Sequence, residues 1–92
     1  MRRNGLFVIL VYDFGVKRVG KALKICRKYL HWVQNSVFEG EISKANFVKL
    51  KKELELLINQ EEDSVIIYTF RSQKYTNREI MGKEKGNVDF FI

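Results

Sequence analysis

The stretch LFVILVYD, from Leu6 to Asp13, decides the fold of this chain. Its first six residues are apolar, and four of them are β-branched or aromatic, a composition typical of one buried β-strand. The strand delivers the carboxylate of Asp13 at its carboxyl end, where sheet proteins usually place their sites. Of the next fifteen residues, six are Lys or Arg. An acid that can hold a divalent cation, beside a basic surface that can hold phosphate, indicates phosphodiester chemistry.

The charge of the chain is concentrated near its start. The 92 residues carry a net charge of +6, and the composition, 46% apolar and 30% charged, is that of an ordinary globular domain rather than of a disordered chain. Residues 1–31 alone sum to +7, and the remainder sums to −1. This one-sided distribution favours a polyanionic partner, nucleic acid first and a membrane surface second, over a purely solubilising charge. No apolar run approaches the length of about 20 residues that spans a membrane, so we expect no membrane partner.

A helix is expected from about Val16 to Leu30, after a turn at Gly15. Apolar residues recur along it three or four positions apart, as on the inward face of an amphipathic helix; they are Val16, Val19, Leu23, Cys26 and Leu30. Basic residues occupy the opposite side and form an outer ridge, which would neutralise phosphates without sequence preference. We call them the basic ridge: Lys17, Arg18, Lys21, Lys24, Arg27 and Lys28.

Residues 32–42 are expected to be extended, as one strand or as two strands with a bend near Asn35-Ser36 or at Gly40. A second helix follows an N-cap at Ser43 and runs to about Asn59. Strong and weak strands are expected at 64–71 and 78–81, and an alternating apolar strand at about 87–92. If residues 32–42 supply two strands, the order is that of split βαβ units. We therefore predict one α+β domain over 1–92, a ferredoxin-like sandwich with an antiparallel sheet and two helices on one face.

The C-terminal strand and Asp13 both raise the question of a second chain. An apolar strand at residues 87–92 either completes this sheet or adds to the sheet of another chain. Asp13 is either a cap or turn residue of the following helix or a metal ligand. Magnesium prefers oxygen ligands and keeps several waters, but one carboxylate per chain makes a poor site. Two chains related by a two-fold axis would supply two carboxylates to one ion, so we expect Asp13 to act in a homodimer.

Two aromatic residues near Asp13 have open roles. Tyr12 would stack on a base or bond a phosphate, or else pack at the strand end with its hydroxyl in water. Phe38 is either a core residue or an aromatic platform beside the site. One Cys and one His in the chain argue against a Cys/His zinc site and a Ser-His-Asp triad, and the lone Cys26 fits a reducing, cytoplasmic setting.

These residues resemble the CRISPR-associated protein two family, the smaller of the two core spacer-acquisition proteins. The matching features are the opening strand that ends Val11-Tyr12-Asp13, the basic first helix, and the block VQNSVFEGEI at residues 33–42. The form Q-x-S-V-F-E-G within that block is the more specific match. The length and the C-terminal strand also fit, so the resemblance covers nearly the whole chain. Phe14-Gly15-Val16 departs from the polar, acidic stretch that some relatives carry after the aspartate.

The resemblance implies a ferredoxin-like homodimer in which each C-terminal strand lies on the partner's sheet. It implies that Asp13 is catalytic and binds Mg²⁺, or Mn²⁺, shared between the protomers, for hydrolysis of phosphodiester bonds in RNA or DNA. It also implies a role in spacer acquisition for antiviral defence, with a CRISPR-associated integrase as a partner. The residues implied beside the cleft, or expected on nucleic acid from their charge, are Tyr12, Lys17, Arg18, Lys21, Arg27 and Phe38.

Two other functions remain open at the level of sequence. Some members of the resembled family act mainly as a non-catalytic scaffold that holds nucleic acid for the integrase. A stand-alone RNA-binding module also fits the fold and charge, although the chain lacks the paired exposed aromatic residues on central strands that such a sheet uses.

Overall fold

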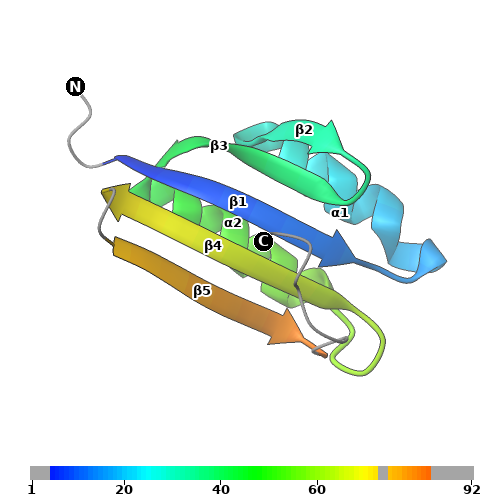
Figure 1. Ribbon diagram of the computed structural model, residues 1–92. Coiled ribbons are helices and arrows are strands. Elements are labelled where there is room, and N and C mark those ends of the chain that lie inside the picture. The colour runs from blue at the N-terminus through cyan, green and yellow to red at the C-terminus, as the bar shows by residue number, and fades with distance from the viewer. Residues whose placement is uncertain (1–4, 73–74, 84–92) are drawn as a thin grey trace.

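The computed structural model describes residues 5–72 and 75–83, which form one antiparallel sheet with two helices packed on the same face (Figure 1). The strand order is β2-β3-β1-β4-β5, and every neighbouring pair is antiparallel. The first four strands have the order of a ferredoxin-like fold, which confirms the predicted fold class. The elements are β1 Gly5–Asp13, α1 Val16–Tyr29, β2 His31–Gln34, β3 Val37–Ser43, α2 Lys44–Leu57, β4 Ser64–Ser72 and β5 Tyr75–Gly82.

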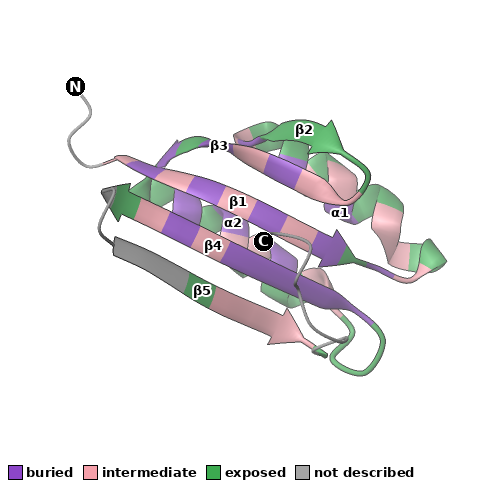
Figure 2. Ribbon diagram, viewed as in Figure 1, coloured by how far each residue is buried: buried purple, intermediate pink, exposed green. Residues whose placement is uncertain are grey.

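Strand β1 lies at the centre of the sheet, between β3 and β4, and its residues alternate between two environments. Leu6, Val8 and Leu10 are buried against the helices. Phe7 and Ile9 are only partly buried and point to the face without helices, and Figure 2 shows this alternation along β1. The strict period of two is what a strand at the boundary of a helix-covered core requires.

Residues 32–42 supply two strands, not one. The chain turns at Asn35 and Ser36, and Gln34 pairs with Val37 across this two-residue loop. Asn35 has a φ of 44°, a left-handed conformation that Asn tolerates better than most residues. The alternative bend at Gly40 does not occur, because Gly40 pairs with Val8 inside β3.

The two helices cover the core as the apolar spacing predicts, with one exception. Ala22 and Cys26 of α1 are buried, but Val16, for which the spacing predicts an inward position, is 90% exposed. Val16 lies about 120° around the helix from Ala22, so it points away from the sheet. The predicted cap of α2 is confirmed, because the backbone N–H of Asn46 donates to Ser43 Oγ at 3.1 Å. Phe47, Leu50 and Leu54 form the buried face of α2.

The last described strand, β5, is longer than the segment 78–81 expected from sequence. The expected strand at 87–92 and its pairing with a second chain lie outside the described residues. Within 5–72 and 75–83, no helix combines the length and the apolar character needed to cross a bilayer.

Candidate functional site

Asp13 is the last residue of β1 and is exposed. It pairs with Ser64 of β4, so the strand holds its backbone on that side. The N-cap of α1 is Gly15, which excludes the alternative in which Asp13 occupies the capping position. By the alternation of β1, Asp13 belongs to the same face as Ile9 and Val11, the face without helices.

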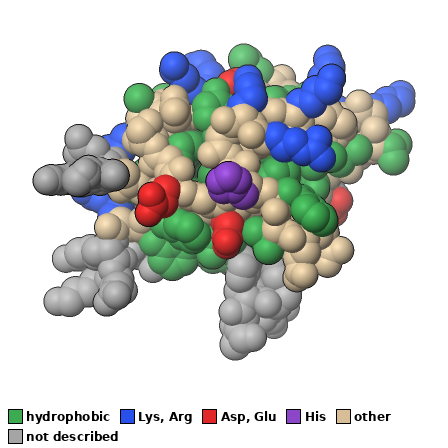
Figure 3. Space-filling view, turned by 90° about the horizontal axis from the view of Figure 1, so that it is seen from above, with side chains coloured by type: hydrophobic (Ala, Val, Ile, Leu, Met, Phe, Trp, Pro, Cys, Tyr) green, Lys and Arg blue, Asp and Glu red, His purple; other side chains and the backbone are tan. Residues whose placement is uncertain are grey.

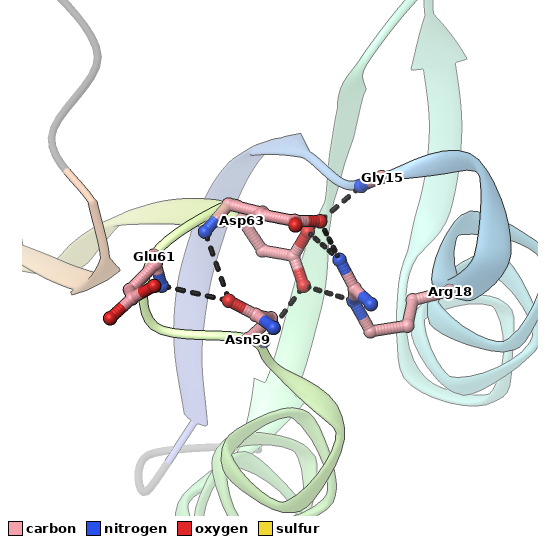
Figure 4. A network of polar contacts seen from close by, with 6 residues as sticks. Gly15, Arg18, Asn59, Glu61 and Asp63 are labelled. Atoms are coloured by element: carbon pink, nitrogen blue, oxygen red, sulfur yellow. Dashed lines mark hydrogen bonds and ion pairs between the residues drawn. The ribbon is translucent and has the colours of Figure 1, made fainter.

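A buried acid, Asp63, fixes the loop that follows Asp13. Its side chain has no exposed surface, and its carboxylate accepts hydrogen bonds from Gly15 N at 2.8 Å and Asn59 N at 2.8 Å. Arg18 Nε donates to the same carboxylate at 2.5 Å, which makes an ion pair (Figure 4). Burying a carboxylate costs several kcal/mol. An ion pair together with hydrogen bonds to both oxygens can offset that cost. Asp63 therefore ties the turn beside the candidate site to the end of α2.

Asp63 also supplies the charge that the start of α1 lacks. The first turn of α1 contains no acidic residue, and Gly15 offers no side chain to cap it. A carboxylate at a helix N-terminus accepts the unpaired backbone N–H groups and complements the helix dipole. The Arg18 guanidinium, followed by the Gly15 and Asn59 N–H groups, holds the pKa of Asp63 down at about 2 against the cost of burial.

Arg18 of the basic ridge is directed inward. Besides Asp63, its guanidinium binds Glu62 Oε1 at 2.8 Å, and its side chain is only 20% exposed. These two carboxylates raise the pKa of Arg18 further above its usual value. The structure thus gives Arg18 a role inside the protein, and its contact with nucleic acid stays a prediction.

The two aromatic residues predicted beside the cleft belong to the core. Phe38 has no exposed surface, so the prediction that its ring contacts nucleic acid is wrong for this structure, because a buried ring cannot stack on a base. The Tyr12 ring lies 5.9 Å from that of Phe38, and its hydroxyl donates to Asn35 O at 3.3 Å. Burial raises the pKa of Tyr12, and its ring packs rather than projects. Both rings pack on the helix-covered side of the sheet at the end of β1.

The rest of the basic ridge lies on the surface of α1, and the members with exposed side chains are Lys17, Lys21, Lys24, Arg27 and Lys28. Lys28 binds Glu53 of α2 at 2.6 Å, whereas Lys17 and Lys21 form no ion pair within the described part of the chain. Figure 3 shows several Lys and Arg side chains along one margin of the molecule, with acidic side chains beside the single histidine, His31.

Sequence reasoning missed one surface residue near this end of the sheet. Trp32 of β2 is 57% exposed, and its indole Nε1 donates to Asn35 O at 3.0 Å, the same carbonyl that accepts the Tyr12 hydroxyl. The sequence shows only an aromatic residue at this position. The structure places it in the four-residue edge strand β2, where few neighbouring residues can cover its ring.

Asp13 is a suitable magnesium ligand, but one carboxylate is only part of a magnesium site. Asp13 offers an exposed carboxylate, the hard oxygen donor that Mg²⁺ prefers. Among residues 5–72 and 75–83, however, no three His, Cys, Asp or Glu side chains gather as metal ligands do. Cys26 is buried, and burial raises the pKa of its thiol to about 12, so it stays protonated and inert. A metal at Asp13 would need further protein donors from outside the described residues of one chain.

We predict that Asp63→Asn lowers stability at neutral pH, by about 2–3 kcal/mol, since hydrogen bonds to a charged group contribute roughly that amount. Because the folded-state pKa of Asp63 lies below its unfolded value of 3.8, its stabilisation is present above pH 4 and is lost as pH falls toward 2. Urea unfolding of both proteins at several pH values should show their stabilities converging in acid.

The matched control is Glu62→Gln, which removes the exposed partner of the same Arg18 and should cost less than about 1 kcal/mol. A loss for Glu62→Gln equal to that for Asp63→Asn, or a difference between Asp63→Asn and the parent that does not change with pH, would contradict the assigned role of Asp63.

Comparisons with known proteins identify the family of this chain. The model of the family described as CRISPR associated protein Cas2 matches residues 6–78. The chain is 55% identical over 80 residues to a Dictyoglomus turgidum protein named CRISPR-associated endoribonuclease Cas2, covering 87% of this chain and 92% of that protein. A Thermotoga maritima protein of the same name is 55% identical over 87 residues, which cover 95% of this chain and 100% of that protein.

Solved structures give the same answer for the fold. A crystal structure titled cas2 superposes with a TM-score of 0.71 at 42% identity, covering 91% of this chain and 94% of the other. The Streptococcus pyogenes Cas2 crystal structure at pH 6.5 superposes with a TM-score of 0.62 at 35% identity, covering 67% of this chain and 82% of the other. With a family model that matches most of the sequence and relatives of this identity along it, the chain belongs to the CRISPR-associated Cas2 family.

Proposed function

We propose that this chain is a CRISPR-associated, magnesium-dependent endonuclease that hydrolyses phosphodiester bonds, with RNA as the first substrate to test and DNA as the second. The observation that carries the proposal is Asp13, an exposed carboxylate at the carboxyl end of the central strand of the sheet. The relatives are named endoribonucleases, which supports cleavage over the non-catalytic scaffold role. The cellular setting that we propose is spacer acquisition, together with a CRISPR-associated integrase.

The working unit that we propose is a homodimer formed through the sheet face without helices. That face carries a row of apolar side chains, among them Phe7 and Phe70, whose rings lie 6.2 Å apart. An antiparallel sheet can leave a polar face in water, but an apolar face is stabilised by burial, and among the described residues the helices cover only the other face. Ile9, Val11 and Asp13 follow one another on this face, so two stacked copies would bring two Asp13 carboxylates to one interface.

The Asp13 carboxylates of the two copies would hold the magnesium ion, with water completing its coordination. When bound, the ion lowers the pKa of a coordinated water and offsets the charge of the attacked phosphate. The chain itself positions the carboxylate: β4 holds the strand end at Ser64, and Asp63 holds the next turn at Gly15. The exposed lysines of the basic ridge would hold the flanking phosphates.

Asp13→Asn keeps the size of the side chain and removes its charge. We predict that it lowers the rate of single-stranded RNA cleavage by about a hundredfold or more, the usual cost of losing electrostatic stabilisation of a transition state. Binding of the same RNA should be retained. Gel assays of cleavage with Mg²⁺, Mn²⁺ and EDTA, together with filter binding, measure both effects.

Glu55→Gln on the outer face of α2 is the control for loss of one exposed acid, and it should cleave at the parental rate. Unchanged cleavage by Asp13→Asn would refute a catalytic role for this carboxylate. Unchanged spacer capture in cells, despite lost cleavage, would leave the scaffold as the biological role.

The dimer can be tested at Ile9, in the middle of the face without helices. We predict that Ile9→Glu yields a monomer, because an unpaired carboxylate buried at the interface costs several kcal/mol, or about a hundredfold or more in dimer affinity. Cleavage should disappear with the dimer. Analytical ultracentrifugation gives the mass, and circular dichroism checks that the monomer is folded.

Val48→Glu on the exposed side of α2 is the matched control and should leave both mass and cleavage unchanged. A parent protein that is monomeric at concentrations where it cleaves RNA would rule out the shared metal site.

The basic ridge predicts how binding depends on salt. Replacing Lys17 and Lys21 together by Gln should reduce the slope of log affinity against log salt by about 1.4 for single-stranded RNA, or about 0.7 for each phosphate that the protein no longer neutralises. The pair Lys49→Gln and Lys52→Gln on α2 removes the same charge from another surface and should change the slope little. Equal slopes for the parent and the Lys17/Lys21 variant would remove the ridge from the interface.

A further inference from the structure

The sheet face without helices carries opposite charges on two separate strands. The register places one residue from each of the five strands in a single row, and direct partners in an antiparallel sheet point to the same side. In strand order, the row is His31, Glu39, Ile9, Tyr68 and Arg78. An acid on β3 and a base on β5 therefore lie on the same face as Ile9, with β1 and β4 between them (Figure 1).

The two charges do not meet within one chain. Neighbouring strands lie about 4.8 Å apart, so three strand steps separate the backbones of Glu39 and Arg78 by about 14 Å. Glu39 forms no ion pair with any described residue, its neighbour His31 included. It is only partly exposed, whereas Arg78 is exposed. Glu39 thus lies on a largely apolar face, and no cation of its own described chain binds it.

A second copy on this face, as the proposed function requires, would change the surroundings of Glu39. A carboxylate that loses its water without gaining a cation opposes association strongly. A stable interface must therefore bring a cation to Glu39. Among the strand residues that the described register pairs, the only Lys or Arg is Arg78.

Symmetry decides which strands of two stacked copies face each other. The two-fold axis lies between the sheets and runs either across the strands or along them. An axis across the middle of the strands would stack β3 on β3, bring the two Glu39 carboxylates together and hold the two Asp13 residues at opposite ends. An axis along β1 keeps both Asp13 residues at one end. It also lays the β3 side of each copy over the β4 and β5 side of the other.

This second arrangement suits an ion pair between the copies. Stacked sheets lie about 10 Å apart, a distance that a Glu and an Arg side chain span together. The planar guanidinium of Arg also binds a carboxylate through two parallel hydrogen bonds. We propose that Glu39 of each copy binds the partner's Arg78, and that these two symmetry-related ion pairs fix the orientation in which the copies stack. The inference rests on the homodimer of the proposed function and adds which strands meet.

Exchanging the two charges tests this pairing in the full-length protein. Glu39→Arg and Arg78→Glu each place like charges opposite one another in both pairs of the dimer. We expect each variant alone to dimerise about a hundredfold more weakly than the parent, because two pairs are lost and close interfacial charge pairs each contribute about tenfold or more.

An equal mixture of the two variants should dimerise as the parent does, since each substituted side chain then faces an opposite charge. The double variant, with both substitutions in one chain, should dimerise for the same reason. Analytical ultracentrifugation gives the dimer affinity, and native mass spectrometry identifies the heterodimer by its mass. Circular dichroism checks that each variant is folded.

Glu55→Arg on the outer face of α2 is the matched control, because it makes the same charge change away from the sheet face. It should dimerise as the parent does, and mixing it with Arg78→Glu should leave the Arg78→Glu chain largely monomeric. Parental dimerisation of either single variant of the pair overturns the ion pairs. A mixture of Glu39→Arg and Arg78→Glu that stays monomeric overturns them as well.

Cleavage by the same proteins tells this failure from that of the proposed function. A parent that is dimeric and cleaves RNA, with variants that do not restore each other, overturns only the ion pairs. Restored dimerisation in a protein that cleaves neither RNA nor DNA supports the ion pairs and overturns the nuclease. A monomeric parent overturns both.

Discussion

The carboxylate of Asp63 is the constraint on which the arrangement around the candidate site depends. It is fully buried, and it is satisfied by two backbone N–H groups and one guanidinium that come from two distant segments of the chain, residues 15–18 and Asn59. Since an unpaired buried charge is not tolerated, these parts can assemble in few ways. The end of β1, the start of α1 and the end of α2 are therefore brought to one point, and Asp13 lies two residues from it. Gly82 belongs to the same junction, because a Cβ there would lie 2.2 Å from Asp63 O.

The sequence predicted the fold well because its signals are local. The apolar run of β1, the apolar spacing of the helices and the Ser43 cap each act within a few residues, and each element is found in the structure. The two-strand arrangement of residues 32–42 could not be decided from pattern, because it depends on Asn35 accepting a left-handed conformation. The inward position predicted for Val16 is wrong, because its spacing is helical but the first turn of a helix need not lie over the sheet.

The candidate site was only partly predictable, because side chains far apart in the sequence decide it. Asp13 could be found as an acid at a strand end. Nothing in the sequence pairs Arg18 with Asp63, which lies 45 residues later within an acidic loop. Phe38 is buried and Trp32 is exposed, although both are aromatic residues of neighbouring strands. The two pair across β2 and β3, but Phe38 lies under the helices whereas Trp32 lies on the edge strand beyond them.

The fold thereby separates two kinds of basic residue that look alike in the sequence. Arg18 has a planar guanidinium that can bond two carboxylates at once, and it is used inside the protein. The lysines of the ridge are compact charges on flexible stems, and most stay at the surface. Such charges attract any polyanion and cannot choose among nucleic acids. Selection must then come from groups with fixed geometry. One such group is the Asp13 carboxylate, which ends the central strand and precedes the turn that Asp63 holds at Gly15.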